Sequence, residues 1–111
     1  IDARSVVPFN YEPVCKSVEK TGRILLVSEA CTRGSILNDM ASHLSQLSFD
    51  YLDAAPYVLG AQNWVTPASE YDEYFFPQVD DILDAINEKL LPLEGREGNP
   101  KFRKAEQLRK A

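Results

Sequence analysis

Few side chains in this sequence have the type and spacing that catalysis or metal binding requires. Cys15 and Cys31 are the two cysteines, each isolated in its own segment, without a C-x-x-C pair or a Cys/His cluster. His43 is the single histidine, and no serine, cysteine or acid accompanies it at a spacing known from nucleophilic catalysis. The sequence therefore indicates neither a zinc site nor a redox dithiol, and the isolated His43 is not the pattern of a catalytic histidine. We expect two free thiols and a histidine that is packed beside a helix stripe or lies at its rim.

One stretch has the position of a ligand-binding loop. Glu29–Gly34 follows an apolar run and precedes a helical pattern, and ligands in open α/β sheets bind beyond the carboxyl ends of strands. The stretch contains one glycine, so it does not indicate a phosphate cradle. Capping of the following helix by Thr32 or Ser35 is the simpler interpretation.

The elements that position these residues alternate between helix and strand. Ile24–Val27 is a continuous apolar run between Gly22 and Ser28, which is typical of a strand buried on both faces. Tyr57–Gly60 predicts a second such strand, and apolar periodicity predicts helices over 11–20, 35–48 and 78–91. This order predicts an α/β domain.

The composition is that of a globular protein, and its charge is unevenly distributed. Of the 111 residues, 44% are apolar and 26% charged, with a net charge of −5. Residues 1–93 carry a net −8 and residues 94–111 a net +3, so we expect a domain over 1–93 and a polar, basic tail over 94–111 that is loose or partly helical. An acidic body argues against nucleic acid as a partner. No apolar run approaches the ~20 residues that span a bilayer.

The first residues of the sequence suggest that it belongs to a longer protein. Ile1-Asp2-Ala3 resembles the end of a strand, and position 1 is not methionine. We expect the chain to be a piece of a longer protein that resides in the cytoplasm of a bacterium, or in the mitochondrial matrix of a eukaryote.

The segment 61–77 combines five of the eleven aromatic residues with two prolines and no clear period. We expect Phe75 and Phe76 to anchor the following helix, while Trp64, Tyr71 and Tyr74 face a partner, because rings with a polar tip are enriched at interfaces. The acids of this segment lack the spacing of a calcium loop. Their spacing leaves paired-carboxylate catalysis open, although exposed acids at a helix start are commoner.

Several phrases resemble one particular family. They are Asp2-Ala-Arg-Ser-Val-Val-Pro8, Ser17-Val-Glu-Lys-Thr-Gly-Arg23 with the apolar strand to Glu29, and Thr66-Pro67 through Phe76-Pro77. Over residues 1–92 the chain resembles the C-terminal, transketolase C-terminal-like domain of the beta subunit of the decarboxylating component of 2-oxo acid dehydrogenase complexes. Asn63-Trp-Val-Thr-Pro67 and Tyr74-Phe-Phe-Pro-Gln78 look closest to 2-oxoisovalerate (branched-chain) members, with pyruvate dehydrogenase as the other possibility.

The resemblance implies a three-layer α/β/α fold with a five-stranded, mostly parallel sheet. It implies oxidative decarboxylation of a 2-oxo acid with acyl transfer to a lipoyl group, using thiamine diphosphate and magnesium held by other domains. No catalytic, cofactor-binding or metal residue carries over to this chain, so we expect the fragment alone to be inactive. The domain's expected role is contact with other subunits or domains, and docking to the acyltransferase core in some members.

The chain also departs from the family pattern. Cys31-Thr-Arg33 stands in a loop that is usually richer in glycine, and Gly60-Ala-Gln62 has an amide where many members have an aspartate. Two other classes remain open: a free-standing flavodoxin-like module with a small ligand near Thr32–Ser35, and a purely structural interaction domain.

Overall fold

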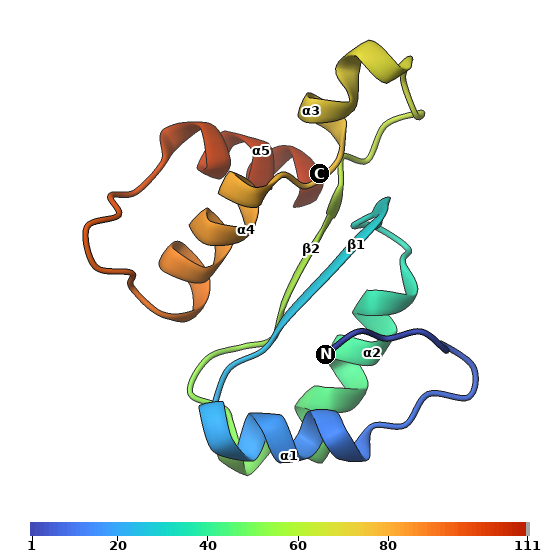
Figure 1. Cartoon of the computed structure of the whole chain (residues 1–111), viewed down its shortest axis with the longest axis vertical. Helices are drawn as coiled ribbons and strands as arrows, with labels where there is room; N and C mark the ends of the chain where they lie inside the picture. Colours follow the sequence, from blue (N-terminus) through green and yellow to red (C-terminus); the bar gives the residue numbers. More distant parts are fainter. Residues whose placement is uncertain (111) are drawn as a thin grey trace.

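The centre of the molecule is a pair of parallel strands. The computed structural model describes residues 1–110. In it, β1 (Leu25–Cys31) and β2 (Tyr57–Ala61) run side by side between two groups of helices (Figure 1). Leu25, Leu26 and Val27 lie opposite Tyr57, Val58 and Leu59, and the pairing becomes irregular before Cys31 meets Ala61. The two apolar runs thus form the predicted strands.

The sheet has two strands within residues 1–110, whereas the family resemblance implies five. The prediction that Ile1–Ala3 ends a strand is wrong for this structure, because these residues are exposed and belong to no ladder. A β-strand forms only where a neighbouring strand hydrogen-bonds to its N–H and C=O groups. No described segment pairs with residues 1–7 in this way. The five-stranded sheet stays a prediction.

One face of the sheet is covered by α1 (Glu12–Thr21) and α2 (Ile36–Leu47). Asparagine is a good N-cap type, which predicts Asn10 as the cap of this helix. The N-cap position is Tyr11, one residue later, but the Asn10 side chain does accept a hydrogen bond from the Glu12 N–H of the first turn at 3.1 Å. Gly22 ends the helix at φ 69°, a conformation that favours glycine. The buried apolar residues of this layer are Val14, Val18, Leu26, Met40, Ala41 and Leu44.

The other face is covered by α4 (Val79–Ala85) and α5 (Pro100–Lys110). The helix predicted over 78–91 is present, but its last part, Ile86–Leu90, is a wider π-helical turn. It begins where the Gln78 N–H donates to the Asp81 carboxylate at 2.9 Å. The buried apolar residues here are Leu59, Ala85 and Phe102.

Residues 94–111 were expected to form a loose or partly helical tail, and residues 100–110 of them form α5. This helix is attached to the body, since Phe102 is 2% exposed and clusters with Leu59 of β2 and Ala85 of α4. The buried stripe of α5 consists of Phe102, Glu106 and Arg109, so only one of its members is apolar. Hydrophobic periodicity therefore does not reveal it. Residue 111 lies outside the described residues.

Two further expectations from the pattern do not hold. The spacing of the acids in helix 78–91 predicts that Asp84 faces water, but it is 2% exposed because Arg96 and Asn99 enclose it. The large apolar residues of the connector 49–56 are predicted to be anchors, yet Phe49 and Tyr51 are 75% and 52% exposed in a short 3₁₀ turn (Phe49–Tyr51) after α2. Of the three large residues, only Leu52 is partly buried against the cluster.

Candidate interaction surface

The first residues of segment 61–77, which follow β2, are held in place by hydrogen bonds to other parts of the chain. The Gln62 N–H donates to the Phe75 carbonyl at 3.1 Å, which ties the two ends of the segment together. The side-chain Oδ1 of Asn63 accepts from the Arg33 backbone N–H at 2.9 Å, and its side-chain Nδ2 donates to the Arg109 backbone carbonyl of α5. Asn63 thus joins the β1–α2 loop to α5, a role for which the sequence gives no signal.

The amide that replaces the family's usual aspartate is buried. Gln62 is 4% exposed and directly follows β2. A neutral amide loses less hydration than a carboxylate on burial, although the Oε1 of Gln62 has no hydrogen-bond partner among the described residues.

The rings of this segment divide into one buried ring and several exposed ones. Phe75, at the end of α3 (Asp72–Phe75), is 2% exposed and lies edge-on to Phe76, with ring centroids 4.9 Å apart. Phe75 is thus buried and Phe76 is partly buried against it, while their predicted role as anchors of the following helix stays a prediction. Trp64 rests against the same buried ring, with its ring centroid 6.3 Å from that of Phe75.

The three interface candidates all reach solvent. Trp64, Tyr71 and Tyr74 are 51%, 57% and 65% exposed. Tyr71 and Tyr74 lie on the 3₁₀ turn Ser69–Tyr71 and on α3, which projects from the end of the sheet (Figure 1). Trp64 has no ring contact with either tyrosine among the described residues. We call Trp64, Tyr71 and Tyr74 the aromatic surface: three half-exposed rings on one folded segment.

Acidic groups border this surface. Glu70, Asp72 and Glu73 are all exposed. A hydrogen bond with the Glu73 carboxylate, together with its charge, raises the pKa of the Tyr74 hydroxyl. Tyr74 therefore stays a neutral hydrogen-bond donor at physiological pH. The arrangement combines apolar ring area with negative charge, which fits a partner surface that carries cations.

In the loop between β1 and α2, which the sequence offers as a possible ligand site, the hydroxyl groups form hydrogen bonds within the protein. The Thr32 hydroxyl accepts from the Gly60 N–H at 3.0 Å and donates to the Ala61 carbonyl at 3.4 Å. The Ser35 hydroxyl accepts from the Leu37 N–H at 3.2 Å, which makes it the cap of α2. The capping interpretation is thus confirmed for Ser35, and Thr32 links the two strands.

The single histidine and the two cysteines do not form a common site. His43 is exposed and its ring lies 4.6 Å from that of Tyr11, so it sits at the rim of α2 as expected. Cys15 and Cys31 are free thiols, as expected. Within residues 1–110, no three His, Cys, Asp or Glu side chains form a group that could hold a metal ion. In the same part of the chain, no helix has the length and apolarity to cross a membrane.

Comparison with known proteins identifies the class. The family described as "Transketolase, C-terminal domain" matches residues 1–82, and the chain belongs to this family. Its α/β architecture with a parallel sheet agrees with that assignment.

Among individual proteins, the chain is similar to beta subunits of pyruvate dehydrogenase. The chain is 38% identical over 87 residues to the pyruvate dehydrogenase E1 component subunit beta of Chlorokybus atmophyticus, covering 78% of this chain and 26% of that protein. It is 34% identical over 90 residues to the subunit of the same name from Mycoplasma pneumoniae, covering 81% and 28%. A third, from Rhizobium meliloti, is 32% identical over 87 residues, covering 78% and 19%. The matched part thus spans about a quarter or less of the length of these relatives.

Proposed function

We propose that this chain is the C-terminal domain of a beta-type subunit of a thiamine-diphosphate-dependent 2-oxo acid dehydrogenase, and that it holds the subunits or domains of that enzyme together. The proposal is supported by membership in the transketolase C-terminal domain family and by relatives named as pyruvate dehydrogenase beta subunits. The single observation that carries the assembly role is the aromatic surface. Its rings are half exposed, yet they stand on a segment fixed by Phe75, Gln62 and Asn63.

Binding costs less conformational entropy when the contacting side chain is already held in place. A ring on a mobile loop loses much freedom when it binds, whereas a ring on a fixed segment loses little. Trp64 is already held against Phe75, and Tyr74 is part of α3. Tyrosine and tryptophan offer large contact area and a polar tip, and they carry much of the binding energy in known interfaces.

The proposal also covers the substrate of the enzyme, its acyl acceptor, its docking partner and its location. The names of the relatives favour pyruvate as substrate, while the wording of residues 63–67 and 74–78 keeps a branched-chain 2-oxo acid such as 2-oxoisovalerate as the alternative. We propose that lipoyl on the acyltransferase accepts the acyl group, that the acyltransferase core docks in part on this domain, and that the enzyme works in the cytoplasm or in the mitochondrial matrix.

Thiamine diphosphate and magnesium are proposed to bind elsewhere in the enzyme, so this chain alone binds neither and is inactive. Calorimetric titration of the isolated chain with both should give no heat beyond dilution. A micromolar site on the isolated chain would contradict the assignment of cofactor binding to other domains.

The assembly role is tested by removing the aromatic rings one at a time. Trp64→Ala is expected to weaken association with the remaining subunits of the dehydrogenase by more than about 1 kcal/mol, roughly a fivefold rise in Kd. Tyr71→Ala and Tyr51→Ala form a matched pair, since both tyrosines are just over half exposed but only Tyr71 belongs to the aromatic surface. Tyr71→Ala should weaken association and Tyr51→Ala should not.

The isolated domain supplies the control for folding. Its thermal midpoint should be nearly the same with Trp64 or with alanine, because half of the ring is already in water. If Trp64→Ala unfolds the isolated domain, the ring is a core residue and the assembly role fails. Equal losses for Tyr71→Ala and Tyr51→Ala would also contradict it.

A further inference from the structure

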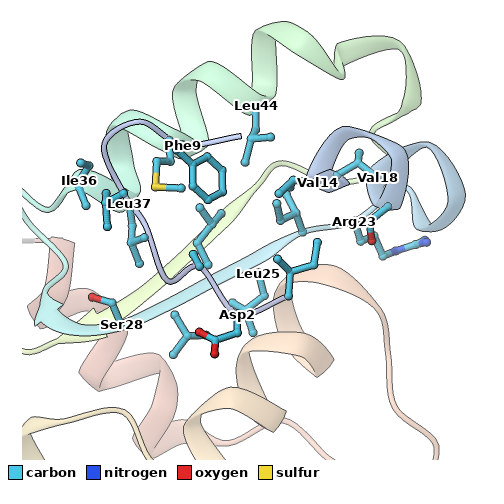
Figure 2. A pocket seen from close by; sticks show the side chains of 18 of the residues that line it. Asp2, Phe9, Val14, Val18, Arg23, Leu25, Ser28, Ile36, Leu37 and Leu44 are labelled. Carbon is cyan, nitrogen blue, oxygen red and sulfur yellow. The ribbon is translucent and has the colours of Figure 1, made fainter. Parts of the chain in front are cut away.

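The last helix, α5, docks on the sheet with a side that is more polar than apolar. Among its described side chains, Phe102 is the one buried apolar residue, whereas Glu106 and Arg109 are 7% and 5% exposed. On the opposite side of the sheet, a groove of about 720 Å³ is lined mainly by apolar side chains such as Leu37 and Leu44 (Figure 2). The contrast shows that α5 depends on more than apolar contact to stay docked.

Two ion pairs connect α5 with the end of the preceding helix. Lys89 pairs with Glu106 at 2.9 Å, and Arg103 donates to Glu88 at 2.9 Å. The side chains of the two cations are 31% and 61% exposed, so dissolved salt screens both pairs. The docking of α5 therefore weakens as the ionic strength rises.

The buried arginine of α5 opposes docking. The Nε and Nη1 atoms of Arg109 are buried, and neither has a hydrogen-bond partner among the described residues. A guanidinium that leaves water without such partners loses hydration, which costs free energy. Docked α5 is thus supported by ion pairs that salt weakens and opposed by the burial of Arg109. A segment in this balance opens locally while the rest of the fold persists.

The end of α5 reaches the segment that carries the aromatic surface. The carbonyl groups in the last turn of a helix have no partner within the helix. One of them, at Arg109, accepts a hydrogen bond from the Asn63 side-chain Nδ2, while Asn63 Oδ1 accepts from the Arg33 backbone N–H at 2.9 Å. Asn63 directly precedes Trp64. Docked α5 therefore holds one of the two polar groups of the side chain beside Trp64.

We propose that α5 is a charge-controlled latch that positions Trp64 through Asn63. While α5 is docked, the Arg109 carbonyl holds the Asn63 amide and keeps residues 63–65 in place. When salt weakens the ion pairs, α5 leaves, this hydrogen bond is lost and residues 63–65 become mobile. The hydrogen bond from the Gln62 N–H to the Phe75 carbonyl does not involve α5, so the rest of the segment keeps its fold.

The latch deepens the proposed function and rests on it for one consequence only. A mobile Trp64 loses more conformational entropy on binding than a fixed one, so release of α5 weakens assembly with the other subunits. Asn63 is then a positioning residue of the aromatic surface.

The test uses Trp64 as its own probe, because it is the only tryptophan of the chain. Time-resolved fluorescence anisotropy measures the fast local motion of its ring. Phe102→Ala removes the buried apolar contact of α5, and the amplitude of this motion should rise about twofold or more. Leu108→Ala is the matched control, because Leu108 lies on the same helix but is 47% exposed. It should leave the motion of Trp64 unchanged.

Salt provides the same test without a substitution, so the result does not depend on the folding of Phe102→Ala. Raising the ionic strength from about 0.01 M to about 1 M shortens the Debye length from about 30 Å to about 3 Å. The motion of Trp64 in the original chain should rise by a similar factor. Hydrogen exchange at the amides of residues 104–109 reports the release of α5 itself, and it should become about tenfold faster.

Asn63→Asp distinguishes the latch from a general loosening of the fold. Aspartate keeps the Oδ1 acceptor for the Arg33 N–H but lacks the Nδ2 donor for the Arg109 carbonyl. In Asn63→Asp the motion of Trp64 should already be high, and neither salt nor Phe102→Ala should raise it further, because coupled changes are not additive.

Three results would overturn the proposal. The amides of α5 exchange equally fast at low and high salt, or α5 is released while the motion of Trp64 stays the same. The third is that salt raises this motion equally in the original chain and in Asn63→Asp. The assembly role is measured separately, as the Kd of Trp64→Ala for the other subunits, so failure here and failure of the proposed function are distinguishable.

Discussion

The two faces of the β1–β2 sheet are covered by different physical means. On the face of α1 and α2, six buried apolar residues form one cluster, and partly buried neighbours such as Ile24 and Val58 extend it. On the face of α4 and α5, only Leu59, Ala85 and Phe102 are buried apolar residues. The second face is held largely by polar contacts between α4, the loop after it and α5.

Those polar contacts are charge pairs that connect α4 and its π-helical end with the following loop and with α5. Arg96 donates to Asp84 at 2.7 Å, Arg103 to Glu88 at 2.9 Å, and Lys89 pairs with Glu106 at 2.9 Å. In each pair the carboxylate is largely buried and the cation more exposed. Burial, followed by the nearby Glu106 carboxylate, raises the pKa of the Tyr57 hydroxyl on β2 to about 12. The comparison shows that a helix can dock on a sheet with one aromatic anchor when charged groups complete the contact.

We call the face covered by α1 and α2 the apolar face and the face covered by α4 and α5 the polar face. The largest effect of a mutation is expected on the apolar face. Leu44→Ala removes a side chain that is 1% exposed at the centre of the cluster. The lost transfer free energy and the cavity should lower the free energy of unfolding by about 2–5 kcal/mol in a urea titration.

Leu47→Ala on the same helix is the matched control. Leu47 is 51% exposed, so the free energy of unfolding should change by less than about 1 kcal/mol. Equal losses for the two variants would mean that the apolar cluster does not dominate this face.

The apolar face is also the part of the fold that the sequence predicts well. The spacing of Ile36, Met40 and Leu44 predicts α2, and the run from Ile24 to Val27 predicts β1, because apolar periodicity is the direct record of burial against a neighbour. The start of α1 near Asn10 and its end at Gly22 were predictable from local hydrogen bonding and backbone conformation.

The polar face could not be predicted in the same way. Asp84 and Glu106 are charged residues in helices that carry many charges, and exposed and buried acids look alike in a sequence. Their burial depends on partners 12 and 17 residues away, Arg96 and Lys89 respectively, whose positions are set by the loop after α4. The aromatic surface was predictable as a group of rings, but the position of Asn63 between Arg33 and Arg109 depends on the tertiary fold.

A smaller effect is expected on the polar face. Asp84→Ala leaves Arg96 without its closest carboxylate and the Asn99 amide without its acceptor, which lies 2.7 Å away. Leaving these partly buried donors without partners should lower the free energy of unfolding by about 1–3 kcal/mol. Asp80→Ala is the matched control, because the Asp80 side chain is 84% exposed and pairs with the same arginine. Its cost should be below about 0.5 kcal/mol, and a cost equal to that of Asp84→Ala would show that burial does not decide the strength of these pairs.

The smallest expected effect is a difference in pH dependence between the faces. At Glu88, partial burial acts to raise the pKa of the carboxyl. Hydrogen bonds from the Asn99 N–H and from Arg103 outweigh it, so the pKa is lower than that of an ordinary glutamate. The unfolded chain then binds the proton more readily than the folded chain does.

The contribution of Glu88 to stability is therefore fully present above the ordinary glutamate pKa of about 4.3, and it is lost as the pH falls through the lower pKa of the folded state. Glu88→Gln cannot take part in this titration. The difference in unfolding free energy between the original chain and Glu88→Gln should be constant from about pH 7 to pH 5.5 and should shrink below about pH 4.3. Arg103→Gln should reduce the same pH dependence by removing one of its two causes. A difference that stays constant down to about pH 3 would show that the contact between Glu88 and α5 does not depend on the charge of the carboxylate.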